Sequence, residues 1–235
     1  LVFLPSCHST NQVAYDIIGK ERVSDGTLVI TSNQTAGRGQ MGNSWEAAPN
    51  LNLTFSLIFN PRFLRANEQF LLNMAVSLAI TDWLSTRTSF CKIKWPNDIF
   101  WKDKKLGGIL IQNMLRGGQL EHSIVGIGMN INQKKFSVPS ATSLTEVAGE
   151  TFVLSDLLAE LAMHMEHRYL QLRGGGAGIH QEYLSRLYRF GQEHVFEDNG
   201  YFKATIVDVE PTGSLILQTA EGRRSYQFKE VSFVI

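Results

Sequence analysis

The 235-residue chain lacks the features of membrane, secreted and strongly charged proteins. No apolar run reaches the ~18 residues of a membrane-spanning helix, and the apolar start LVFL lacks the basic leader and the length of a signal peptide. Lys+Arg and Asp+Glu both number 22, which argues against a nucleic-acid binder held by bulk charge. We therefore expect a globular cytoplasmic protein that binds neither nucleic acid nor membrane.

Residues that commonly ligate metals are also scarce. The two cysteines, Cys7 and Cys91, are far apart in the sequence and have no metal-ligand spacing, so we expect two free thiols. His164 and His167 lie in HMEHR, on a predicted amphipathic helix without a third ligand nearby. A structural metal site is therefore not predicted there.

Helical and strand patterns follow one another irregularly up to about residue 190. Strands are predicted at 2–5, 26–34, 52–61, 91–95 and 121–132, with a β-hairpin around KDKK at 102–105. One helix is predicted from residue 9, where Ser9 and Gln12 fit a capping box. Further helices are predicted over 68–84, over 154–172 with Ser155 as the N-cap, and over 179–190, where Gly191 ends the helix. Because strict βαβ alternation is missing, we predict an α+β fold with a mixed or antiparallel sheet flanked by helices.

After Gly191 the pattern changes to short strands separated by NG, PTG and AEG. Such spacing is typical of a small all-β unit. We place a domain boundary between a domain of residues 1–189 and a small barrel of about five strands over 190–235.

The stretch QTAGRGQMGNSW, at 34–45, contains the pattern G-x-G-x-x-G. A dinucleotide-binding turn requires a helix directly after the glycines, and a kinase loop requires a V-A-I-K strand. Here NSWEAAPN and a strand follow, so neither interpretation fits. A glycine-rich loop that carries Arg38 can close over a phosphate or carboxylate, although an ordinary surface loop is an equal alternative.

Two further stretches extend this pattern. KWPNDIFWKDKKLGGIL, at 94–110, places Lys94, Asn97, Asp98 and Lys105 around one turn and hairpin, and GIGMNIN, at 126–132, ends a strand. Together with HSTNQ and QTAGRGQMGNSW, these stretches resemble, in order and in approximate spacing, the motifs of biotin protein ligases. The resemblance covers nearly all of the predicted catalytic domain, and the C-terminal unit resembles the small Src-homology-3-like domain of that family.

The resemblance implies a two-step activity with biotin, ATP and Mg²⁺. Biotin and ATP would form biotinyl-5′-adenylate, and a lysine of a biotin carboxyl carrier protein would then attack it and release AMP. Because the biotin carboxylate and the α-phosphate repel each other, the first step needs positioned cations. A lipoate or octanoate ligase of related fold is the alternative, but it should lack KWPND.

The resemblance also implies roles for charged residues. Lys105 would bridge the biotin carboxylate and the α-phosphate, Lys94 would contact the ATP phosphates, and Arg38 would bind both carboxylate and phosphate. Asp98 would hold Mg²⁺, which needs only one or two carboxylates. The alternatives are a solvated hairpin lysine at position 105 and a turn-forming aspartate at position 98.

The remaining assignments concern neutral groups and backbone. Ser9 is as consistent with helix capping as with biotin contact, and Trp45 as consistent with a half-buried loop aromatic as with adenine stacking. The predicted biotin-binding set is Ser9, Thr10, Asn11, Gln34, Arg38, Gly39, Gln40, Lys105 and Gly108. The predicted adenylate-binding set is Arg38, Trp45, Lys94, Asn97, Gly128 and Asn130. Gly107 and Gly126 would let the backbone approach the ligand closely.

Gln40 departs from the family pattern, because many members carry a second arginine there. Fewer cations over the adenylate predict weaker retention of that intermediate. Because HSTNQ starts by residue 8, we expect a monofunctional ligase without an N-terminal DNA-binding domain. A homodimer remains open.

Overall fold

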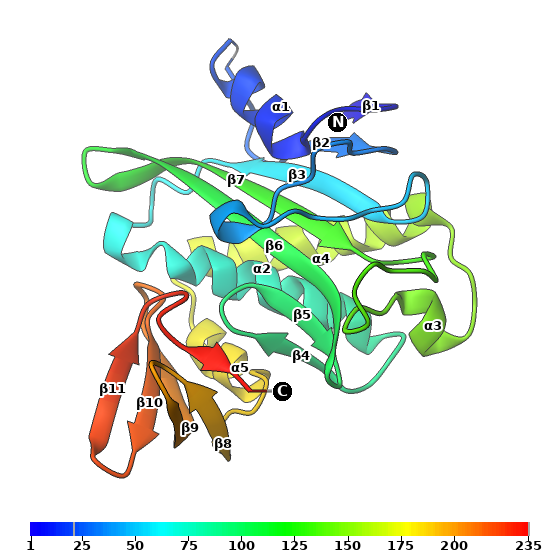
Figure 1. The fold of residues 1–235 in the computed structure, drawn as a ribbon. Coiled ribbons are helices and arrows are strands. Elements are labelled where there is room, and N and C mark those ends of the chain that lie inside the picture. Colours follow the sequence, from blue (N-terminus) through cyan, green and yellow to red (C-terminus); the bar gives the residue numbers. More distant parts are fainter. Residues whose placement is uncertain (21, 235) are drawn as a thin grey trace.

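The computed structural model describes residues 1–20 and 22–234 and contains two β-sheets, with helices packed mainly against the first (Figure 1). The seven-stranded sheet has the order β1-β2-β3-β7-β6-β5-β4. Only β1 and β2 pair in parallel among its described strands, so the sheet is mixed but largely antiparallel, as predicted. Its strands are β1 (Val2–Leu4), β2 (Thr27–Thr31), β3 (Leu53–Phe59), β4 (Cys91–Lys94), β5 (Asp98–Trp101), β6 (Lys104–Arg116) and β7 (Gln119–Met129).

Five α-helices and two short 3₁₀ helices accompany the described strands. They are α1 (Thr10–Ile18), α2 (Phe70–Ser85), α3 (Leu144–Ala148), α4 (Leu154–Arg173), α5 (Ile179–Ser185), η1 (Gln40–Gly42) and η2 (Ala66–Glu68). None of these helices combines the length and apolar character needed to cross a bilayer. In Figure 1, α2 and α4 lie along one face of the sheet and α1 lies at the β1–β2 end.

The sequence of β3 explains how the two faces differ. Its odd-numbered residues, from Leu53 to Phe59, are all apolar and join the core that contains α2 and α4. Successive strand side chains point to opposite faces, so Thr54, Ser56 and Ile58 face the other way. Ile58 packs with Ala14 of α1 in a second cluster. The polar Thr54 and Ser56 therefore lie beneath the α1 side of the sheet, where the candidate site is found.

Three predicted details of helix ends are wrong. Ser9 occupies the N-cap position of α1 but makes no capping bond, and Gln12 bonds Asp16 instead. Helix α4 begins one residue before Ser155, with Val153 as N-cap. Helix α5 ends at Ser185 rather than at Gly191.

The early end of α5 has a physical reason. The backbone N–H of Ile93 donates to the carbonyl of Arg186 at 2.9 Å, and the N–H of Tyr188 donates to the carbonyl of Ile93 at 2.8 Å. Residues 186–188 therefore cover the outer edge of β4 in an extended pairing. An uncovered sheet edge presents unpaired backbone groups, so this segment pairs with β4 instead of continuing the helix.

One buried arginine joins three helices. The Arg168 side chain on α4 is 9% exposed and contacts Asp82 of α2 at 2.6 Å and Glu182 of α5 at 2.7 Å. Burial raises the pKa of Asp82, but hydrogen bonds from Arg168 and Arg186 outweigh it and hold the pKa below its ordinary value. This cluster fixes α2, α4 and α5 behind the sheet.

The chain ends in a five-stranded antiparallel sheet of order β11-β10-β9-β8-β12. Its strands are β8 (Glu193–Glu197), β9 (Tyr201–Val209), β10 (Leu215–Thr219), β11 (Gly222–Tyr226) and β12 (Ser232–Phe233). The last strand returns to pair with β8, and the Trp95 indole N–H donates to the carbonyl of Gly213 at 2.9 Å. The bond from Trp95 to Gly213 links the C-terminal sheet to the β4–β5 turn.

Candidate functional site

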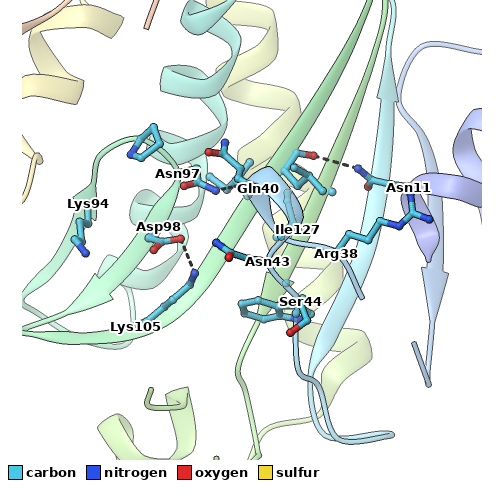
Figure 2. A pocket seen from close by; sticks show the side chains of 18 of the residues that line it. Asn11, Arg38, Gln40, Asn43, Ser44, Lys94, Asn97, Asp98, Lys105 and Ile127 are labelled. Carbon is cyan, nitrogen blue, oxygen red and sulfur yellow. Dashed lines mark hydrogen bonds and ion pairs between the residues drawn. The ribbon is translucent and has the colours of Figure 1, made fainter. Parts of the chain in front are cut away.

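A cavity of about 380 Å³ lies over the α1 side of the seven-stranded sheet. Its walls come from the N-terminus of α1, the glycine-rich loop of residues 37–45, the β4–β5 turn, strands β3, β6 and β7, and residues 228–233. Figure 2 shows side chains that line it from α1, the loop and the sheet. The predicted site residues that line it are Ser9, Thr10, Asn11, Gln34, Arg38, Gly39, Gln40, Trp45, Lys94, Asn97, Asp98, Lys105, Gly108 and Gly128. Predicted site residues from Ser9 to Gly128, about 120 positions apart in the sequence, thus line one cavity.

Glycines make the floor of this cavity. Gly128 pairs with Gly108 on one side and with Thr54 on the other. A Cβ atom added to Gly128 would lie 2.3 Å from the indole ring of Trp45, a distance that real Cβ atoms do not show. The absence of a side chain on Gly128 therefore lets Trp45 lie directly on the strand.

A β-bulge determines which way Lys105 points. Asp98 pairs with Gly108 and Ile99 with Gly107, but Phe100 pairs with Lys105, so β6 has one extra residue, Leu106. Lys105 and Gly108 are three residues apart and would face opposite sides of a regular strand. With the bulge, Lys105 shares the cavity face with Asp98, and Leu106 turns into the core.

Both the backbone and the side chain of Lys105 are held by neighbouring groups. Its backbone N–H donates to the carbonyl of Ser140 at 2.7 Å, and its carbonyl accepts from the N–H of Thr142 at 2.9 Å. Its Nζ lies 2.7 Å from Oδ1 of Asp98 and 5.7 Å from the centre of the Trp45 ring (Figure 2). The ammonium group is thus held in the cavity beside the Asp98 carboxylate.

Lys94 lies beside this pair, since Lys94 and Asp98 are cross-strand partners. Its Nζ lies 4.9 Å from the ring centre of Phe100 and 5.3 Å from that of Phe233. Burial lowers the pKa of Lys94, and Lys105 and Arg189 lower it further, while Asp98 acts in the opposite direction. A partly dehydrated cation of this kind gains more from an incoming anion than a fully hydrated one.

The glycine-rich loop forms a small closed hairpin over the cavity. The N–H of Gly39 donates to the carbonyl of Asn43 at 2.7 Å, and that of Trp45 donates to the carbonyl of Gly37 at 3.0 Å. Its only helical turn is the short η1, and the strand β3 follows, which confirms that it is not a dinucleotide-binding turn. Figure 2 shows Arg38 turned toward Asn11, on the opposite side from Lys94.

The end of the cavity near α1 is polar and uncharged apart from Arg38. The backbone N–H of Thr10 donates to Oε1 of Gln34 at 2.9 Å. The carboxamide of Asn11 donates to the carbonyl of Leu110 at 3.3 Å and to Oε1 of Gln112 at 2.9 Å. The cavity therefore has a neutral hydrogen-bonding end and a charged end, which contains Lys94, Asp98 and Lys105.

Asn130 does not belong to the cavity lining. It is 3% exposed, and its Nδ2 donates to the carbonyl of Thr142 at 3.0 Å, whose own N–H donates to the carbonyl of Lys105. Its Oδ1 has no hydrogen-bond partner among the described residues. In this structure Asn130 braces the segment that holds Lys105, and its predicted role toward adenine stays a prediction.

One wall of the cavity was not predicted from the sequence. The C-terminal residues that line the cavity are Phe228, Lys229, Val231, Ser232 and Phe233. No short pattern connects this stretch with the sheet residues it meets, because they lie more than a hundred positions earlier. The pairing of β12 with β8 brings them there.

Comparisons with known proteins agree with this geometry. Residues 3–130 match the model of the biotin/lipoate A/B protein ligase family. The bifunctional ligase/repressor BirA of Bacillus subtilis is 30% identical over 232 residues, covering 94% of this chain and 70% of that protein. The biotin–[acetyl-CoA-carboxylase] ligase of Paracoccus denitrificans is 30% identical over 228 residues, covering 90% of this chain and 92% of that protein.

Solved structures share the fold over the whole chain. The biotin protein ligase from Aquifex aeolicus, in complex with biotin and ATP, superposes with a TM-score of 0.79 at 24% identity and covers 99% of this chain and 97% of its own. The Leishmania major enzyme in complex with biotinyl-5-AMP superposes with a TM-score of 0.64 at 22% identity, covering 96% and 98%. With the family match and these relatives, the chain belongs to the biotin/lipoate A/B protein ligase family.

Proposed function

We propose that this protein is an ATP-dependent ligase that converts biotin to biotinyl-5′-AMP and transfers the biotinyl group to a lysine of a biotin carboxyl carrier protein. The Paracoccus denitrificans relative is named as a biotin–[acetyl-CoA-carboxylase] ligase and the Bacillus subtilis relative as a bifunctional ligase/repressor, and the Aquifex aeolicus structure holds biotin and ATP. The division of the cavity into a neutral hydrogen-bonding end and a charged end is the observation that carries the proposal.

The two ends fit the two parts of the adenylate. The ureido ring of biotin is neutral and has N–H donors beside a carbonyl, which suits Thr10 and Gln34 at the α1 end. The charged end holds Lys94 and Lys105, which suit phosphates and a carboxylate. A ligand that spans the cavity would therefore place its reacting carboxylate near Lys105.

The charged residues would act by offsetting repulsion between two anions. Lys105 would contact the biotin carboxylate and the α-phosphate, where charge develops in the transition state. Lys94 would hold the ATP phosphates. Arg38, which is turned toward Asn11 in this structure, would have to swing toward Lys105 to bind the carboxylate. Trp45, already under the Lys105 ammonium, would pack against the nucleotide.

Magnesium forms part of this proposal. Asp98 is the one carboxylate among the described residues that line the cavity. A single carboxylate is sufficient, because Mg²⁺ keeps several waters and takes further oxygens from phosphates. Asp98 would exchange its contact with Lys105 for the metal, which would supply additional positive charge at the triphosphate. The exchange would also free Lys105 for its own anionic partner.

We also propose that residues 190–235 form a small Src-homology-3-like barrel appended to a catalytic domain of residues 1–189. The five-stranded sheet with its returning last strand supports this. Residues 228–233 reach the cavity, so this unit would contribute to the site rather than serve as a separate module.

Biotin-dependent exchange of pyrophosphate into ATP tests the proposed activity, with lipoate and octanoate as controls. We expect exchange with biotin and much weaker exchange with either fatty acid, since neither has N–H groups for the α1 end of the cavity. Exchange with lipoate but not with biotin would overturn the substrate assignment. Labelling of a carrier domain with radioactive biotin then tests the transfer step.

A further inference from the structure

A network of buried hydrogen bonds lies under the α1 end of the cavity. Ser56, Gly126 and Leu110 are cross-strand neighbours on β3, β7 and β6. The carboxamide of Asn11 sits directly above the middle of this row, because a Cβ added to Gly126 would lie 2.2 Å from Oδ1 of Asn11. Asn11 therefore packs directly against three strands of the sheet, although it belongs to α1.

The direction of each hydrogen bond in this network follows from one backbone group. The carbonyl of Leu110 can only accept, so the Asn11 atom 3.3 Å away must be Nδ2. This leaves Oδ1 of Asn11 toward Ser56, at 2.6 Å. Since Oδ1 also can only accept, the single hydroxyl proton of Ser56 must be donated to it.

The next link sets the polarity of Thr10. Its Oγ1 lies 2.7 Å from Oγ of Ser56. Because the Ser56 proton is already used, this 2.7 Å contact is a hydrogen bond only if Thr10 donates its own proton to Ser56. The hydroxyl of Thr10 then has only lone pairs left, so it presents an acceptor to the cavity. Oε1 of Gln34, at 3.4 Å, is the more distant and therefore weaker of the two acceptors within reach of the Thr10 hydroxyl.

Gln34 is oriented in the same way by a backbone donor. The N–H of Thr10 can only donate, so the Gln34 atom 2.9 Å away must be Oε1. Nε2 of Gln34 then points elsewhere, toward Gly37, where an added Cβ would lie 2.8 Å from it. It makes no hydrogen bond to another described residue. The α1 end thus presents a hydroxyl acceptor at Thr10 and an amide donor at Gln34.

We propose that Ser56 is a positioning residue that determines ligand specificity by forcing the Thr10 hydroxyl to act as an acceptor. Ser56 is fully buried and does not line the cavity, so it touches no ligand. Its effect passes through Thr10, which accepts one N–H of the ligand's cyclic urea. This rests on the proposed function. It also reassigns Asn11, whose two amide protons are both bonded within the protein, from ligand contact to support of Ser56.

The proposal predicts a specificity change and not merely a weaker site. Without the Ser56 hydroxyl, Thr10 loses its short contact on the strand side, and its proton can turn away from β3, toward the cavity and the more distant Oε1 of Gln34. The Thr10 hydroxyl then presents a donor to biotin, so one N–H of biotin loses its acceptor. An analogue with an oxygen at that position of the ring meets a donor where the wild-type protein has an acceptor.

The experiment compares Ser56→Ala with wild type by calorimetric titration. The ligands are biotin and the two cyclic carbamates in which oxygen replaces either ring N–H. Ser123→Ala is the matched control, because Ser123 is also fully buried in the sheet and bonds Asn113 at 2.7 Å, outside this network. Thermal melting of each variant checks the fold.

We expect wild type and Ser123→Ala to prefer biotin over both carbamates. In Ser56→Ala, biotin should bind about 10- to 100-fold more weakly, a change in the range of one lost buried hydrogen bond. One of the two carbamates should bind Ser56→Ala at least as tightly as it binds wild type. The ratio of its Kd to the Kd of biotin should therefore fall. An equal loss for all three ligands would mean that Ser56 serves structure only and would overturn the proposal. Failure of the wild type to bind biotin would instead refute the proposed function.

Discussion

Replacement of Lys105 by alanine distinguishes a catalytic lysine from a hairpin lysine. The side chains of Lys105 and Asp98 are 35% and 22% exposed, so loss of their 2.7 Å contact should cost about 1 kcal/mol of folding free energy or less. Loss of a positioned charge at the reacting phosphate should cost much more, about 100- to 1,000-fold in rate. We therefore expect a folded protein whose biotin-dependent exchange of pyrophosphate into ATP is nearly abolished.

Two further variants make this assay decisive. Lys104→Ala removes the adjacent exposed lysine of the same strand and should leave exchange unchanged. Asp98→Asn combined with Lys105→Ala tests whether Lys105 matters only as the partner of Asp98. If the lysine merely neutralised that carboxylate, and the carboxylate held no metal, the double variant would regain activity over Lys105→Ala. Such recovery, or normal exchange by Lys105→Ala itself, would refute the assignment of Lys105 to the ligands.

Three other predictions follow from the structure. Arg168→Met should lower the free energy of unfolding at pH 7 by about 3 kcal/mol, measured by urea denaturation. Because the pKa of Asp82 is depressed in the folded protein, this loss of stability should shrink as the pH falls through that pKa. A loss that does not depend on pH would contradict the ion-cluster explanation. Gln40→Arg should slow release of biotinyl-adenylate in a rapid-dilution assay, and an unchanged off-rate would argue against a retention role for this position. Gly128→Ala should displace the Trp45 ring and raise the KM for ATP at least about tenfold in the exchange assay. An unaltered KM would mean that the nucleotide does not bind against Trp45.

Local sequence patterns were sufficient for most strands and for placing the charged residues near one another, while their roles came from the family resemblance. The alternation in β3 predicts a strand, and turn-forming residues predict the β5–β6 hairpin that contains Lys105. Lys94, Asp98 and Lys105 lie within one turn and hairpin, so the short-range pairing of β4, β5 and β6 is enough to gather them. The same reasoning failed at the end of α5, where residues 186–188 pair with a strand distant in sequence.

What the sequence by itself determined is thus which segments form strands and helices, and which motifs carry the charged groups. Only the tertiary structure decided how those groups face one another. The bulge at Leu106 breaks the two-residue period and turns Lys105 into the cavity. Ser56 meets Asn11 across 45 positions, and residues 228–233 close a wall formed by much earlier strands. Such contacts depend on register and on long-range packing, which no local periodicity records.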